Sequence, residues 1–414
     1  MARILFLTQV LPYPLDAGPK IRASYTLRHL ARRHEVTLVS FVRPDDRPEA
    51  LAHLESICGE VQAVPMRRSR LRDVRAVLEA AVRCMPVVIV RDQIAEMQEA
   101  LRSLVGRQAY DVIHADQTSM AQYALWARAE AQKSRPSQRV PIVLDAHNAL
   151  FRVFRQMQAQ ESAPLRRLAL AREARALERY ERFLWATFDQ TAFVADADRL
   201  LAGRDTMADD GRLSTIPICI DAADRAPVAL APEPHLVTHL GTMFWPPNID
   251  AVLWFAREVF PRVLERVPEA RFVVIGKRPP EAVQRLGQSP HIDVLGYVPD
   301  PTPYLEQTAA FLVPLRAGAG MRVKILDAWC WGVPIVSTTL GADGIEAHDG
   351  EDLLIADDAA QYAAAVVRLL QEPDLRSRLG ARGRAWVSER YDWQVTYARW
   401  DEIYAGLLGD GAGA

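Results

Sequence analysis

Short apolar runs alternate along the chain with longer segments in which apolar residues recur every three or four positions. The short runs are typical of buried β-strands and the longer segments of helices, so their alternation predicts parallel sheets covered by helices. We therefore predict an α/β fold with two Rossmann-like domains. The predicted strands of the first half are residues 3–8, 35–41, 87–90, 111–115, 140–145 and 191–194, and those of the second half are 235–240, 271–275, 292–295, 309–313, 334–337 and 352–355.

A proline-rich segment separates the two sets of strands. Residues 226–234 read Ala-Pro-Val-Ala-Leu-Ala-Pro-Glu-Pro, which is the composition of a linker. We predict an N-terminal domain over residues 1–225 and a C-terminal domain over residues 226–390. Residues 391–414 place aromatic side chains at helical intervals, which core packing explains most simply, and end in a flexible tail rich in Gly and Ala.

The most distinctive segment is a glycine-rich turn between a predicted strand and a predicted helix. Gly318 and Gly320 allow backbone geometry that other residues avoid, and the helix predicted from about residue 321 to 331 points its N-terminus over the turn. Free N–H groups and the helix dipole favour a phosphate there. Arg322 and Lys324 add positive charge where it disfavours the helix itself, which suggests an anionic ligand.

The same residues allow a plainer interpretation. Asp327 lies three positions after Lys324 and projects on the same face, so the two could form an ordinary surface ion pair. Glycine-rich turns before helices are also common connectors, and this one matches neither a Walker loop nor a GxGxxG fingerprint. From these residues alone, an anion site and a simple connector both stay open.

The sequence from His235 onward resembles the C-terminal half of a family 4 glycosyltransferase with the GT-B fold. The order and spacing of several runs carry this resemblance, and together they are more specific than any single run. The resemblance implies that Asp327 binds the ribose of a nucleotide and that Arg322 and Lys324, beside Gly318 and Gly320, hold its diphosphate. It also implies a C-terminal helix that crosses back onto the first domain. The matching runs are residues 239–248, 271–276, 294–297, 318–328, 332–342 and 350–354.

Two departures from the family pattern bear on activity. The family commonly has two glutamates eight positions apart, and these places hold Ala319 and Asp327 here, so the residue expected to contact the donor sugar is missing. The usual arginine and lysine after the first strand of this half are also absent. Residues 242–248 stand in their place and include Asn248, a candidate cleft residue. A polysaccharide-associated subgroup of the family carries the same pattern, with Arg322 and Lys324 able to supply the charge.

In the first half, the candidate residues follow predicted strands, at the ends where α/β proteins bind ligands. Residues 9–20 form a long connection after the first strand. The resemblance implies that such a loop lines the donor cleft, which makes Gly18 a candidate diphosphate contact, with an ordinary turn residue as the alternative.

His147 follows the apolar strand at residues 141–144, within Asp-Ala-His-Asn. A lone histidine is usually structural, but the resemblance implies a catalytic histidine near the transferred sugar at this place. His114 and Asp116 end another predicted strand and are candidate cleft neighbours, although His114 could also point into the core.

Composition narrows the class of protein. The 414 residues are half hydrophobic, enough for two or three domains, and 50 basic against 52 acidic residues imply no general attraction to nucleic acid. Four cysteines without CxxC spacing argue against a zinc ribbon or a disulfide framework and suit a reducing cytosol. The first apolar run is too short for a signal peptide, and no later run approaches a membrane span. We expect a cytoplasmic protein.

Two basic runs raise the question of peripheral membrane contact. Residues 67–70 with Arg72 and Arg75, and Arg166 with Arg167, could contact anionic lipid headgroups or a lipid-diphosphate acceptor. Glutamates interleave with the second run between residues 173 and 181, which favours a solvated face for that helix. The first run leaves contact with the inner face of the membrane open.

The resemblance implies an enzyme of the hexosyltransferase type that moves a sugar, with retention, from a nucleotide-diphosphate sugar to a glycan, lipid-linked or small-molecule acceptor. The donor would bind the C-terminal domain and the acceptor the N-terminal one. We expect no metal and no cofactor, because Asp209-Asp210 and Asp357-Asp358 look like loop acids and cations can stabilise the leaving group. The alternatives are a nucleotide-sugar binding protein without turnover, or a GT-B epimerase or phosphorylase.

Overall fold

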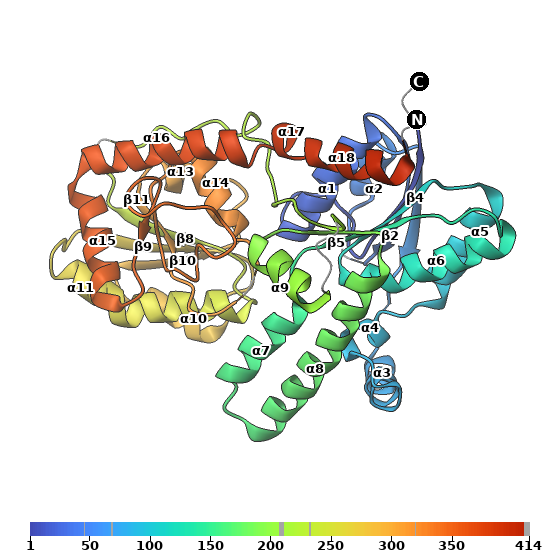
Figure 1. Cartoon of the computed structure of the whole chain (residues 1–414). Helices are drawn as coiled ribbons and strands as arrows, with labels where there is room; N and C mark the ends of the chain where they lie inside the picture. The colour runs from blue at the N-terminus through green and yellow to red at the C-terminus, as the bar shows by residue number, and fades with distance from the viewer. Residues whose placement is uncertain (45, 68, 207–210, 232, 319, 410–414) are drawn as a thin grey trace. The chain divides into compact units, whose positions relative to one another are not determined.

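The computed structural model describes residues 1–44, 46–67, 69–206, 211–231, 233–318 and 320–409. It divides the chain into two compact units, of which the N-terminal unit comprises Met1–Cys219 with Thr396–Ala414 and the C-terminal unit Ile220–Val395. Both units are built on a sheet of parallel strands with helices, which confirms the predicted α/β class (Figure 1). Ala319, the Asp209-Asp210 pair and, of the flexible tail predicted over residues 409–414, residues 410–414 lie outside the described residues.

The sheet of the N-terminal unit has the strand order β3-β2-β1-β4-β5-β6-β7. Its central strands are mostly apolar because helices cover both faces of a parallel sheet, and residues 4–7 of β1 are fully buried. The strands are β1 (Arg3–Thr8), β2 (Glu35–Val42), β3 (Glu60–Pro65), β4 (Val112–Asp116), β5 (Ile142–Ala146), β6 (Gln190–Phe193) and β7 (Leu213–Thr215).

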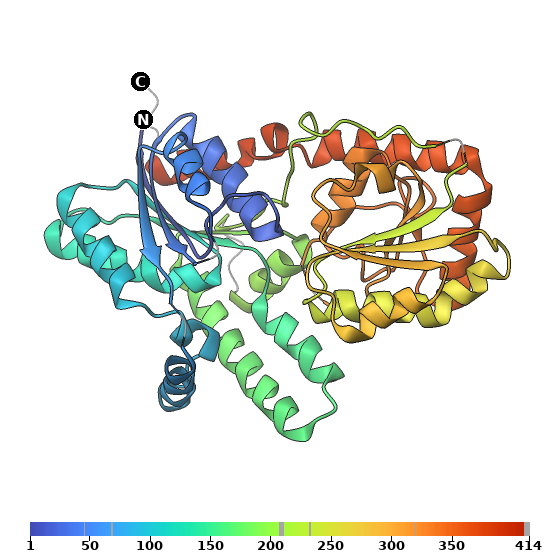
Figure 2. The ribbon, with the colours of Figure 1, turned by 180° about the vertical axis from the view of Figure 1, so that it is seen from behind.

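Ten α-helices belong to the described part of the N-terminal unit. The helices α7 and α8 form an antiparallel hairpin that projects away from the sheet, and α3 projects on the same side in both views (Figures 1 and 2). The helices are α1 (Gly18–Ala31), α2 (Pro48–Glu55), α3 (Arg70–Arg83), α4 (Val87–Arg91), α5 (Ala95–Arg107), α6 (Ala121–Ser134), α7 (Leu150–Gln160), α8 (Pro164–Thr187), α9 (Asp196–Thr206) and α18 (Ala398–Leu408).

The strand predicted over residues 87–90 is wrong, because these residues form α4. Val and Ile favour strands, but a tertiary contact decides the outcome here. The carboxylate of Glu173 on α8 accepts the N–H groups of Val87 and Val88, both at 3.0 Å, and so satisfies donors that a helix start leaves open. The prediction also missed β3 and β7, the two edge strands, whose residues are mostly only partly buried.

The C-terminal unit has the strand order β10-β9-β8-β11-β12-β13, and each strand predicted in the second half is present. The strands are β8 (Leu236–Leu240), β9 (Arg271–Ile275), β10 (Ile292–Gly296), β11 (Thr308–Val313), β12 (Ile335–Ser337) and β13 (Leu354–Ile355). The helices are α10 (Pro246–Trp254), α11 (Phe260–Leu264), α12 (Glu281–Gln284), α13 (Thr302–Leu305), α14 (Val323–Trp331), α15 (Ala359–Gln371), α16 (Pro373–Arg390) and, at the unit boundary, α17 (Trp393–Thr396).

The last helix returns to the N-terminal unit, as the fold prediction requires. Trp400 and Tyr404 of α18 are buried there, so the aromatic stripe predicted at the C-terminus packs in a core. Asp401 fixes the same helix to α1 and to the turn after it, because its carboxylate lies 3.0 Å from His29 Nε2 and 2.8 Å from Arg33 Nη1.

Candidate functional site

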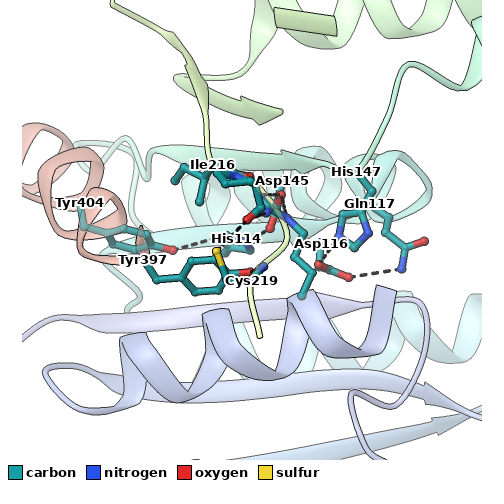
Figure 3. Close-up of polar contacts among 11 residues, drawn as sticks. His114, Asp116, Gln117, Asp145, His147, Ile216, Cys219, Tyr397 and Tyr404 are labelled. Atoms are coloured by element: carbon teal, nitrogen blue, oxygen red, sulfur yellow. Dashed lines mark hydrogen bonds and ion pairs between the residues drawn. The ribbon is translucent and has the colours of Figure 1, made fainter. Parts of the chain in front are cut away.

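Two of the predicted residues meet at the carboxyl ends of β4 and β5 in the N-terminal unit. Asp116 is the last residue of β4, and His147 follows the last residue of β5. His147 Nε2 lies 2.8 Å from Asp116 Oδ1, and Figure 3 draws the two side chains facing each other. Asp116 is fully buried, and 10% of the His147 side chain is exposed. A carboxylate can only accept, so this contact assigns the proton to Nε2 and leaves the other ring nitrogen, Nδ1, as an acceptor in the neutral ring.

A buried ion pair lies beside these residues. Arg22 of α1 donates from Nε to Asp145 Oδ1 at 2.7 Å and from Nη1 to the Ile216 carbonyl at 2.6 Å. Both charged side chains are fully buried. Burial raises the pKa of Asp145, and the Arg22 cation opposes that rise. Arg22 therefore fastens α1 to β5, two residues before His147, and to the segment that follows β7.

His114 takes the second of its two predicted alternatives and points into the core. Its ring stacks on Phe6 with centroids 4.4 Å apart, and its Nδ1 lies 2.9 Å from the Tyr404 hydroxyl. Burial and the nearby Arg22 cation lower the pKa of His114 well below its usual value. The neutral, fully buried ring of His114 therefore belongs to the core beneath the strand ends.

A pocket of about 190 Å³ opens next to His147. Its floor and walls combine amide and carboxylate groups with apolar side chains, a mixture that suits a ligand with hydroxyl groups. Gln9 Nε2 donates to Asp92 Oδ2 at 2.6 Å within it. The lining residues are Gln9, Val88, Ile89, Arg91, Asp92, Gln117, Thr118, Ser119, His147, Asn148, Leu150 and Phe154.

The same strand ends hold the only group of described residues whose spacing could suit a metal ion. One ligand atom each of Asp116, Asp145 and His147 lies within 4.8 Å of the others. However, the Arg22 guanidinium already neutralises Asp145 at 2.6 Å. One of the two carboxylates in this group therefore already has a cationic partner within the protein, whereas Asp116 contacts the His147 ring.

In the C-terminal unit, the glycine-rich turn runs directly into α14. Gly318 and Gly320 have φ angles of 119° and 84°, values that other residues rarely adopt. The helix begins two residues later than predicted, at Val323, so Arg322 is its N-cap residue and only Lys324 stands in the first turn. The difference arises because Arg322, with φ −93° and ψ 85°, has not yet entered helical geometry.

Lys324 lies in a close cluster at the start of α14. Its Nζ donates to Asn248 Oδ1 at 3.0 Å, and Asn248 Nδ2 donates to the Thr242 carbonyl at 3.0 Å. A Cβ at Gly241 would lie 2.7 Å from Lys324 Nζ, so a glycine after β8 makes room for the ammonium group. Burial and the neighbouring Arg322 lower the pKa of Lys324 to about 7, against the effect of Asp327. The cluster therefore holds an incompletely compensated cation at a helix N-terminus.

Asp327 pairs with a residue that the sequence did not single out. Arg225 Nη1 lies 2.5 Å from Asp327 Oδ1, and burial raises the pKa of Asp327 while Arg225 opposes the rise. Lys324 and Asp327 thus each contact another side chain, Asn248 and Arg225 respectively. Gly241 could have been suspected as a glycine directly after a strand, whereas no local signal marks Arg22 or Arg225.

Gly18 is the first residue of α1 and not a turn residue in the preceding loop. Pro19 follows it, and a proline in the first helical turn costs no hydrogen bond, which lets the helix start earlier than predicted. Gly18 and His147 belong to the N-terminal unit, whereas the other candidate phosphate residues and the candidate ribose residue belong to the C-terminal unit.

Comparison with known proteins assigns both units. The pattern of the family described as "Glycosyl transferase 4-like domain" matches residues 17–218, and that of "Glycosyl transferases group 1" matches residues 234–372. Together they cover more than three quarters of the chain.

Two individual proteins are also similar in sequence to this chain. An "Uncharacterized 44.6 kDa protein in cps region" of Klebsiella pneumoniae is 20% identical, over 96% of this chain and 98% of its own. The phosphatidyl-myo-inositol mannosyltransferase of Mycolicibacterium smegmatis is 28% identical over 47% of this chain, and the chain aligns with about half of that relative, 52%.

Among solved structures, Anabaena HepE in complex with UDP-glucose superposes with a TM-score of 0.64 at 15% identity, over 98% of this chain and 100% of its own, which supports the fold. The two family patterns, found in the expected order on two parallel α/β units, show that the chain belongs to the family 4 glycosyltransferases with the GT-B fold.

Proposed function

We propose that this glycosyltransferase transfers a hexose from a nucleotide-diphosphate sugar, with retention and without a metal ion, to an acceptor in glycan or glycolipid synthesis. The observation that carries the proposal is the cluster at the start of α14. Lys324 stands there at a helix N-terminus beside Gly318 and Gly320, with its pKa lowered by burial and by Arg322. An anionic ligand would stabilise the charged form of Lys324 at this helix N-terminus. Asp327, whose carboxylate could bind the ribose, lies about one helical turn farther along α14.

The chemistry that these residues offer is stabilisation of the leaving group. As the bond from the sugar to the diphosphate breaks, negative charge grows on the diphosphate oxygens. Lys324, Arg322 and the N–H groups at the start of α14 would bind that charge more tightly in the transition state than in the bound donor. Fixed cations of this kind would stabilise the leaving diphosphate as a divalent metal ion does in other transferases.

The N-terminal unit would supply the acceptor side. His147 lines the pocket with its ring orientation fixed by Asp116, and the pocket walls offer hydrogen-bonding groups beside apolar ones. A hydroxyl group of the acceptor could bind there close to the transferred sugar. The similar mannosyltransferase is named for phosphatidyl-myo-inositol and HepE was solved with UDP-glucose, which supports a lipid-linked acceptor and a nucleotide-sugar donor. We also propose that the enzyme works at the cytoplasmic face of a membrane.

Turnover with a panel of nucleotide sugars tests the proposed reaction. Each donor is incubated with the protein alone, with a lipid or glycan acceptor extract, and with inorganic phosphate, and release of the nucleoside diphosphate is measured. We expect release that depends on the acceptor and product retention of the anomeric configuration by NMR. Binding without turnover would instead indicate a nucleotide-sugar binding protein, and dependence on phosphate a phosphorylase.

Asp327→Ala should weaken binding of a ribonucleoside diphosphate more than that of its 2′-deoxy analogue. A carboxylate can accept hydrogen bonds from both ribose hydroxyls, and each such bond to a charged group contributes about 1.5–3 kcal/mol. Calorimetric titration of both nucleotides into both proteins measures the difference. Equal losses for the two nucleotides would assign Asp327 a structural role with Arg225, its ion-pair partner.

Binding of the diphosphate should take up protons and should weaken as the pH rises above about 7. Lys324 has its pKa lowered to about 7 in the free protein, and a bound anion would raise it again. Below that pH Lys324 is already charged, and above it part of the binding energy is spent on protonating the ammonium group. Calorimetry in buffers of different ionisation enthalpy measures the uptake. Lys324→Arg, which stays charged, should bind without it, and uptake that persists in this variant would contradict the assignment.

A further inference from the structure

Helix α3 exposes its large apolar side chains instead of burying them. Positions three and four apart share one face of a helix, and on α3 this face points to solvent. Ala76 and Ala80 form the buried side and pack against Val90. A helix normally turns its larger apolar residues toward the core, so this reversed arrangement indicates a surface that meets an apolar phase. The exposed fractions are 86% for Leu71, 60% for Val74, 64% for Leu78 and 85% for Val82.

The helix is well anchored in this orientation. Ser69 Oγ accepts the Arg72 N–H at 3.3 Å as an N-cap, and Arg72 Nη2 donates to the Gln93 carbonyl at 2.9 Å. At the other end, Arg172 Nη2 of α8 donates to the Ala80 carbonyl at 2.7 Å. The exposed apolar face is therefore a feature of the folded unit.

The start of α8 presents a second surface of the same kind. Residues 164–169 are all exposed, with Leu165 at 81% and Leu168 at 67% beside Arg166 and Arg167. The sequence suggested a solvated face because glutamates interleave farther along this helix. The structure removes two of them from the surface: Glu173 accepts N–H groups of α4, and Glu181 accepts those of Leu150 at 2.9 Å and Phe151 at 3.0 Å.

The two surfaces lie on one side of the N-terminal unit. Figures 1 and 2 show α3 and the α7–α8 hairpin projecting in the same direction, and the bond from Arg172 to Ala80 ties them together. We call them the α3–α8 surface. It combines exposed apolar side chains with exposed arginines: Leu71, Val74, Leu78, Val82, Leu165 and Leu168, with Arg67, Arg70, Arg75, Arg166 and Arg167.

We propose that the α3–α8 surface binds an anionic lipid bilayer. The apolar side chains would enter the boundary between headgroups and acyl chains, and the arginines would bind lipid phosphates. A second copy of the chain fits this surface poorly, because the same arginines would then face each other. Helix α4 packs against α3 through Val90, and α7 lies beside α8. Residues of α4 and α7 line the pocket beside His147, so a lipid held at the α3–α8 surface would bring its headgroup near that pocket. This last step rests on the proposed transferase function, whereas vesicle binding does not.

Flotation of the full chain with lipid vesicles tests the proposal without donor or acceptor. Vesicles of phosphatidylcholine alone are compared with vesicles that also contain phosphatidylglycerol. One variant carries Leu71→Gln, Val74→Gln, Leu78→Gln and Val82→Gln, and a second carries Arg70→Gln, Arg75→Gln, Arg166→Gln and Arg167→Gln. A matched control changes exposed residues elsewhere: Leu200→Gln, Arg257→Gln and Arg378→Gln.

We expect the unchanged protein and the control to float with the anionic vesicles and bind neutral ones far more weakly. The apolar variant should lose roughly tenfold or more in vesicle affinity. The arginine variant should lose roughly fivefold for each arginine and most of its salt dependence. All substituted side chains are exposed, and circular dichroism verifies folding. Absence of flotation, or an apolar variant that binds as before, would overturn the proposal. So would self-association that the apolar variant abolishes, which would make this surface an interface between copies.

Discussion

Replacement of Lys324 by Ala should weaken binding of the nucleoside diphosphate tenfold to a hundredfold. The ammonium group stands at the N-terminus of α14, where it would make a charge-assisted hydrogen bond to a phosphate oxygen. Such bonds contribute about 1.5–3 kcal/mol each, and roughly 1.4 kcal/mol corresponds to a tenfold change in affinity. Isothermal titration calorimetry at a pH below 7, where Lys324 is charged, measures the effect.

Two controls separate this effect from general damage. Lys133 is a surface residue of the N-terminal unit, where it pairs with Glu130. Lys133→Ala should leave the affinity for the nucleoside diphosphate unchanged. Lys324→Ala should not lower the melting temperature of the free protein, because it removes an ammonium group whose charged form is disfavoured by burial. Full affinity in a folded Lys324→Ala protein would rule out the phosphate role.

Replacement of His147 by Ala should lower kcat by roughly 10²-fold or more while the affinity for the nucleoside diphosphate stays nearly the same. The ring lines the pocket of the N-terminal unit, whereas the candidate phosphate residues belong to the other unit. A side chain that acts on the transferred sugar contributes to the transition state more than to nucleotide binding, and positioned groups of this kind contribute about 10²–10⁴-fold. Steady-state kinetics and calorimetry on the same preparation provide both quantities.

Asp116 makes a sharper test of the same account. Asp116→Asn keeps the shape of the side chain but no longer presents only acceptor oxygens to His147 Nε2. We expect a smaller loss of kcat than in His147→Ala, because the ring stays in the pocket but is no longer held in one tautomer. His291→Ala, a histidine of the C-terminal unit, serves as the neutral control. Normal turnover in His147→Ala would return that residue to a structural role.

Local patterns predicted most of the fold and the position of the glycine-rich turn. Continuous apolar runs mark the central strands because helices cover both faces of a parallel sheet, and Gly318 and Gly320 stand where the backbone has positive φ. The signal fails where tertiary contacts decide. Residues 87–90 look like a strand and form a helix because Glu173, far along the chain, binds its N-terminus.

The parts of the candidate site that the sequence did not predict depend on distant partners. Arg22 pairs with Asp145, 123 residues away, and Arg225 pairs with Asp327, 102 residues away. The residues that flank these two arginines in the sequence do not distinguish them from the many surface arginines of the chain. The sequence also could not predict the exposed apolar face of α3, because an amphipathic pattern does not reveal which face of the helix packs against the rest of the unit.

A crystal structure of the protein with the nucleoside diphosphate that raises its melting temperature most would test the central claim most directly. Ligands that bind only the folded state raise the melting temperature, so the screen selects the nucleotide. The account predicts phosphate oxygens within hydrogen-bonding distance of Lys324 Nζ and the start of α14, and ribose hydroxyls at the Asp327 carboxylate. A nucleotide bound elsewhere, with this cluster unchanged from its free geometry, would contradict it.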